Sequence, residues 1–108
     1  MYQGTTPIIP LRFKEIDLTE AKIFLTLYDE KKKTNKTYES GVDFTVSFDG
    51  TDTVGTIELS QEQTLGMSSG AHQAQARWIY PDGTAGATVK KKVYVNDVLL
   101  KGVIQYGN

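Results

Sequence analysis

The chain has 108 residues, of which 39% are hydrophobic, with 12 Lys and Arg, 13 Asp and Glu, and no cysteine. This length is typical of one domain with one core, and the lack of cysteine excludes disulfides, zinc–thiolate sites and thiol chemistry. A net charge of −1 is unlike the basic balance of nucleic-acid-binding domains, and no apolar run approaches the ~20 residues of a membrane helix. We therefore expect a soluble, unsecreted single domain, residues 1–108, with neither nucleic acid nor membrane as a partner.

Short runs rich in Val, Ile, Thr, Phe and Tyr, separated by turn residues, indicate strands. Residues 7–14 contain two prolines, which predict an edge or irregular strand because proline cannot donate to a ladder. Residues 17–20 indicate a turn or a single helical turn. Apolar residues alternate over 21–28, which predicts a half-buried strand. Its second face carries Phe24 and Tyr28, either as a partly covered face or as a protein contact surface.

The middle of the chain predicts a hairpin followed by one helical turn. Residues 29–36 indicate a polar loop, which includes 37–39 unless these form a short strand. We expect strands at 42–48 and 53–59, joined at the turn pair Asp49-Gly50.

Residues 60–65 give the one helical signal, in which Ser60 would form a capping box with Gln63.

Residues 71–80 alternate again and lead into a turn and a returning strand at 88–95. A tight hairpin places Trp78 opposite Gly86. Continuing that register puts lysines on the Trp78 face and conflicts with inward positions for the valines at 89, 93 and 95. We infer either a bulge near 84–88 or a longer loop.

The tail, residues 97–108, carries Val98, Leu99, Leu100, Val103 and Ile104, and must dock on the domain or on a partner. The pattern as a whole predicts an all-β fold. We expect an immunoglobulin-like antiparallel sandwich of about seven strands with one short helical turn.

Candidate chemistry is sparse. His72 is the single histidine, without an acidic neighbour in sequence, and is interpreted as a surface or structural residue and not a catalytic one. One histidine and no cysteine leave almost no ligand set for a transition metal. Residues 49–52 lack the spacing of a calcium loop and indicate a hairpin turn. We expect no enzyme, no metal, no cofactor and no small-molecule ligand.

Three groups of residues together resemble a known family. They are 2–7 (YQGTTP), 59–65 (LSQEQTL), and a C-terminal group of AQARW at 74–78, DGT at 82–84, DVL at 97–99 and GVI at 102–104. The chain resembles small proteins encoded among the tail genes of phages and prophages of Gram-positive bacteria, and is similar over nearly its whole length to the N-terminal domain of phage baseplate upper proteins. In longer relatives this domain attaches to the baseplate and a downstream part binds the receptor, so host binding is not implied here.

The resemblance implies a β-sandwich module of a virion tail or baseplate, assembled in the bacterial host cytoplasm, that contacts other tail proteins or itself. It implies no catalytic residues. We expect assembly by edge-strand pairing or docking of apolar termini. The predicted contact residues are Tyr2, Ile8, Ile9, Leu99, Leu100 and Tyr106, unless these side chains merely close the core.

A carbohydrate-binding module is the alternative, because many such modules are sandwiches of this size. It requires exposed aromatic rings, and a lysine run would suit an anionic polymer unless it is only a solvated loop. The candidates for glycan or anion contact are Tyr28, Lys31, Lys32, Lys33, Tyr38 and Tyr94.

Overall fold

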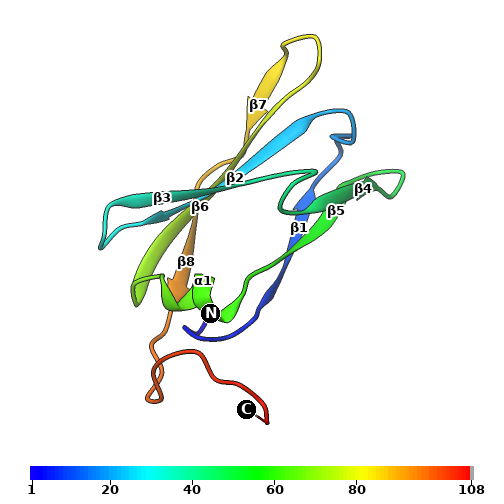
Figure 1. The fold of residues 1–108 in the computed structure, drawn as a ribbon. Helices are drawn as coiled ribbons and strands as arrows, with labels where there is room; N and C mark the ends of the chain where they lie inside the picture. Colours follow the sequence, from blue (N-terminus) through cyan, green and yellow to red (C-terminus); the bar gives the residue numbers. More distant parts are fainter. Residues whose placement is uncertain (108) are drawn as a thin grey trace.

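A computed structural model describes residues 1–107, which form eight strands and one short helix (Figure 1). The elements are β1 (Ile8–Phe13), β2 (Lys22–Asp29), β3 (Thr34–Glu39), β4 (Thr45–Phe48), β5 (Thr53–Glu58), α1 (Gln61–Leu65), β6 (Gly70–Ile79), β7 (Ala85–Ala87) and β8 (Lys91–Val95). The final tail residue, Asn108, lies outside the described residues.

Two antiparallel sheets form the fold. The smaller sheet has the strand order β1-β5-β4, and the larger has the order β3-β2-β6, with β7 and β8 each pairing with a different part of β6. The core cluster takes Ile23, Leu25 and Leu27 from β2, and Phe13 and Ile57 from the smaller sheet. This arrangement confirms the predicted all-β sandwich, and β1 is an edge strand as its prolines predict.

The strand predicted at 42–48 is shorter than expected. It starts at Thr45, because a turn precedes it in which the N–H of Gly41 donates to the carbonyl of Phe44 at 2.7 Å. Val42 lies at this turn and is 75% exposed, whereas Phe44 is buried. The alternating apolar pattern in the sequence is therefore longer than the strand that forms.

The polar segment 29–36 contains more strand than predicted. Asp29 ends β2, and its Oδ1 accepts from the backbone N–H groups of Lys31 and Lys32, each at 3.1 Å. Lys33 completes the turn with φ of 56°, and β3 begins at Thr34. The result is an exposed edge strand instead of a loop.

A one-residue bulge resolves the register of the last strands. Trp78 pairs with Gly86 as predicted, and Arg77 pairs with Ala87, but Ala74 pairs with Lys91. Three residues, 88–90, therefore lie opposite two on β6, which reverses the inward and outward positions of the strand.

After the bulge, Val95 is buried and Val93 is half-buried. The prediction that Val89 also points inward is wrong, because it lies in the bulge and is exposed.

Candidate protein-interaction site

The C-terminal tail is the most exposed apolar part of the described chain. In Figure 1 it leaves β8 and runs outside the two sheets, past α1 and the N-terminus. Leu99 is 104% exposed and Leu100 is 71% exposed, and Val103, Ile104 and Tyr106 are also exposed. Large contiguous apolar surface on a protein marks an interaction site.

One side chain fastens this tail to the body. The amide of Gln61, at the start of α1, donates from Nε2 to the carbonyl of Ile104 at 3.0 Å and accepts from its N–H at 2.9 Å. Within the tail, Lys101 lies 3.9 Å from Asp97. The tail is thus held by its backbone, and this leaves its apolar side chains uncovered.

The N-terminus lies beside the point where the tail begins. Tyr2 forms a parallel bridge with Asn96, and the Met1 ammonium donates to the carbonyl of Tyr94 at 3.0 Å. Tyr2 is exposed next to this bridge. The predicted contact residue Tyr2 therefore lies next to the residue at which the tail begins.

The two predicted contact residues on β1 differ in their exposure to solvent. Ile8 is exposed, whereas the neighbouring Ile9 packs against the core cluster. Alternate residues of a strand point to opposite faces, which separates the two. The prediction of Ile9 as a contact residue is corrected, because its side chain helps to close the core.

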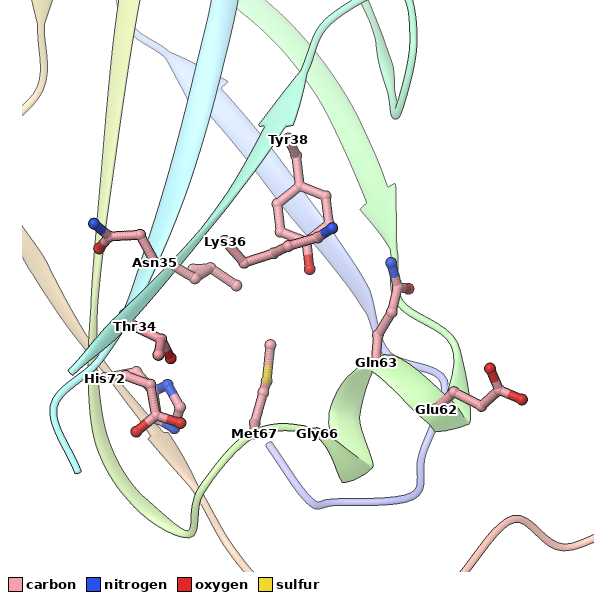
Figure 2. Close-up of a pocket in the computed structure, with 11 residues that line it drawn as sticks. Thr34, Asn35, Lys36, Tyr38, Glu62, Gln63, Gly66, Met67 and His72 are labelled. Carbon is pink, nitrogen blue, oxygen red and sulfur yellow. The ribbon is translucent and has the colours of Figure 1, made fainter. Parts of the chain in front are cut away.

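A groove of about 210 Å³ lies between the edge strand β3 and α1 (Figure 2). Met67 points toward the ring of Tyr38 across this groove, and Leu27 also lines it. Lys36 lies on the β3 wall, with its Nζ 5.8 Å from the centre of the Tyr38 ring, and Glu62 lies on the α1 wall. The groove therefore has an apolar interior with Lys36 beside it, whereas the carboxylate of Glu62 points away from it (Figure 2).

Buried polar groups close one end of the groove. Asp29 Oδ2 accepts from the N–H of Ser68 at 2.9 Å, and His72 Nε2 donates to the carbonyl of Ser68 at 2.7 Å. Burial alone would raise the pKa of Asp29, but the N–H groups of Ser68 and Lys32 stabilise its anion and lower the pKa to about 2. His72 thus has the structural role that the sequence predicts, and the cluster fixes the loop between α1 and β6.

The predicted glycan and anion residues do not form one site. Tyr38 is 3% exposed and belongs to the core, so it is not the exposed ring that was predicted. Tyr94 is exposed on β8, and Tyr28 lines a groove on the outer face of the larger sheet.

The lysine run forms the exposed turn between β2 and β3 and contains Lys31, Lys32 and Lys33. Lys32 is engaged there, because its Nζ donates to the carbonyl of Gly66 at 2.6 Å.

Sequence reasoning missed the groove and the tail fastening. Lys36 is distant in the chain from Glu62 and Met67, and no local pattern joins the two sides of the groove. The sequence around Gln61 predicts only the start of a helix, and nothing in it indicates a partner 43 residues away.

Within residues 1–107 no group of three or more His, Asp or Glu side chains is placed to hold a metal ion. No helix in the same range has the length and hydropathy to cross a bilayer. No protein-family model, curated protein or solved structure matches the chain.

Proposed function

We propose that the chain is a non-catalytic structural protein that acts through protein–protein contacts made by its C-terminal tail. The observation that carries this proposal is the row of uncovered apolar side chains at Leu99, Leu100, Val103 and Ile104. Covering each of these in a contact would contribute about 1.5–3 kcal/mol. A folded body that holds such a tail by its backbone keeps the side chains available to a partner.

The assembly that we propose is a phage or prophage tail, at its baseplate. The support for this is the resemblance of residues 2–7, 59–65 and 74–104 to tail-region proteins. In such a setting the partners would be other tail proteins or further copies of this chain, and the protein would reside in the virion.

Co-purification tests the proposal. The chain is co-expressed with the tail proteins encoded beside it and compared with a variant that carries serine at positions 99, 100, 103 and 104. We expect the unmodified chain to be retained in fixed stoichiometry and the serine variant to be lost. Val42→Ser removes an exposed apolar side chain from the body and should have no effect. Equal retention of the serine variant, or no retention of the unmodified chain, would refute the proposal.

Carbohydrate binding is a second candidate, favoured by the groove on the outer face of the larger sheet. Tyr28 lies there beside hydrogen-bonding side chains that include Asn35, Gln73 and Gln75. Amide groups next to an aromatic ring suit a sugar, which has hydroxyls and apolar C–H faces. Titration with purified bacterial surface polysaccharide, followed by tyrosine fluorescence, should give saturation that Tyr28→Ala removes. A flat titration would eliminate this candidate.

A further inference from the structure

We infer that the chain self-associates by placing the Leu99–Leu100 segment of one copy along β3, at the groove between β3 and α1 of a second copy. The inference rests on the proposed function, because it names the partner and the receiving site of the tail. It depends on the geometry of the groove, the edge strand beside it and the charges at both surfaces.

The size and lining of the groove suit aliphatic side chains. A cavity of about 150 Å³ already holds a benzene-sized apolar group, and this groove has about 210 Å³. Leu27, Tyr38 and Met67 provide its apolar surface. One or two branched side chains would therefore fill it.

The edge beside the groove suits an extended chain. β3 pairs with β2 on one side only, and it is the outermost strand of the larger sheet. An edge strand presents unpaired backbone groups to which an added segment can hydrogen-bond. Because adjacent residues of a strand point to opposite faces, a tail segment lying along β3 would direct one of the two leucines into the groove and place the other beside it.

Charges on the tail and the groove are complementary. Asp97 and Lys101 flank the two leucines and pair only weakly with each other, at 3.9 Å with both side chains largely exposed. The β3 wall of the groove carries Lys36. A tail with Asp97 toward Lys36 would exchange its exposed pair with Lys101 for a pair beside a buried contact.

The tail does not fill the groove of its own copy. It leaves the sheet from β8, which lies across β2 and β6 from the groove strand β3. Gln61 then holds Ile104, and Leu99 and Leu100 stay exposed. The leucines of one copy are therefore available to another.

Complementation between two variants tests the inference. One variant carries Leu99→Ser and Leu100→Ser, and the other carries Thr34→Arg on the groove wall, where the side chain is exposed. Met67→Glu serves as a second groove variant, with circular dichroism to verify its fold. In sedimentation experiments the unmodified chain should self-associate. The dissociation constant of each variant alone should be at least tenfold higher than that of the unmodified chain.

A mixture of the tail variant and the groove variant should form a heterodimer, because one intact tail then meets one intact groove. Tail-to-tail packing would instead give no heterodimer, because the tail variant has no intact tail to contribute. That result would overturn the inference, as would a groove variant that associates like the unmodified chain.

Engineered cysteines provide the second measurement, since the chain has no cysteine of its own. Chains with Leu99→Cys should form disulfides with chains carrying Thr34→Cys, and not with chains carrying Val42→Cys. Equal crosslinking to both positions would overturn the inference. If the chain stays monomeric yet is retained by tail proteins through its apolar residues, this inference fails and the proposed function stands.

Discussion

The indole ring of Trp78 lies directly against the backbone of Gly86, its cross-strand partner on β7. A Cβ atom added at position 86 would lie 2.6 Å from two carbons of that ring. The same indole packs edge-on against Phe13 of the smaller sheet, at 5.9 Å between ring centres. Gly86 thus gives Trp78 the space in which it joins the two sheets.

Gly86→Ala should destabilise the protein by about 1–3 kcal/mol, because the methyl group must displace the indole or the strand. Urea unfolding gives this difference. Gly66→Ala is the matched control, since its Cβ would meet no atom closer than 3.5 Å and its φ is −73°. A Gly86→Ala protein as stable as the Gly66→Ala protein would show that the contact is not restrictive.

Ser60→Ala should cost about 1 kcal/mol of unfolding free energy. The Ser60 hydroxyl accepts from the N–H of Gln63 at 3.1 Å, and the Gln63 side chain accepts from the N–H of Ser60 at 2.7 Å. Ser47→Ala, on the exposed strand β4, should change stability by less than about 0.5 kcal/mol. Equal effects of the two substitutions in thermal or urea unfolding would contradict a stabilising cap.

Asp29 should make stability depend on acid pH. Its pKa is lowered to about 2 in the folded protein from an ordinary value of 3.8, so its stabilising contribution is complete above about pH 4 and is lost as the pH falls toward 2. The expected loss is about 2 kcal/mol. Urea unfolding at pH 6, 4, 3 and 2 measures it.

Asp29→Asn should be less stable than the unmodified chain at pH 6, because the amide nitrogen cannot accept from the N–H of Ser68. The gap should shrink toward pH 2, where about half of the folded protein has Asp29 protonated. Glu20→Gln, at an exposed carboxylate, is the control. A gap that stays constant with pH would show that Asp29 is not the titrating group.

Gln61→Ala should free the tail without unfolding the body. Loss of both hydrogen bonds to Ile104 removes the protection of its amide, so hydrogen exchange at Ile104 should accelerate while β2 and β6 exchange as before. Gln73→Ala, on the outer face of β6, provides an amide control. Unchanged exchange at Ile104 would argue against the fastening.

Local patterns predict the central strands well, for identifiable reasons. β2 alternates cleanly because one face meets the core, and the Trp78–Gly86 pair follows from turn chemistry at 81–84. The capping box of α1 is likewise a short-range signal. These elements depend on residues within a few positions of each other.

The features that were missed depend on contacts distant in sequence. Leu18 is fully buried in a segment that indicates only a turn, and its N–H donates to Thr53 Oγ1, 35 residues away. β3 carries mostly exposed polar residues, so its sequence lacks the alternation of apolar and polar residues that predicts a strand. The groove combines residues of β3, α1 and the loop after it, and the position of the bulge follows from the fit of β8 to β6.

The bridge between Tyr2 and Asn96 has a practical consequence for engineering. Because the first residues lie beside the end of β8, a short linker could join them and convert the body into a closed ring of polypeptide. The exposed turn at Asp82-Gly83, where Gly83 has φ of 90°, would then be the natural place to open new termini. Such a circular permutant would lack the tail altogether, and its behaviour would separate the folding of the sandwich from everything the tail does.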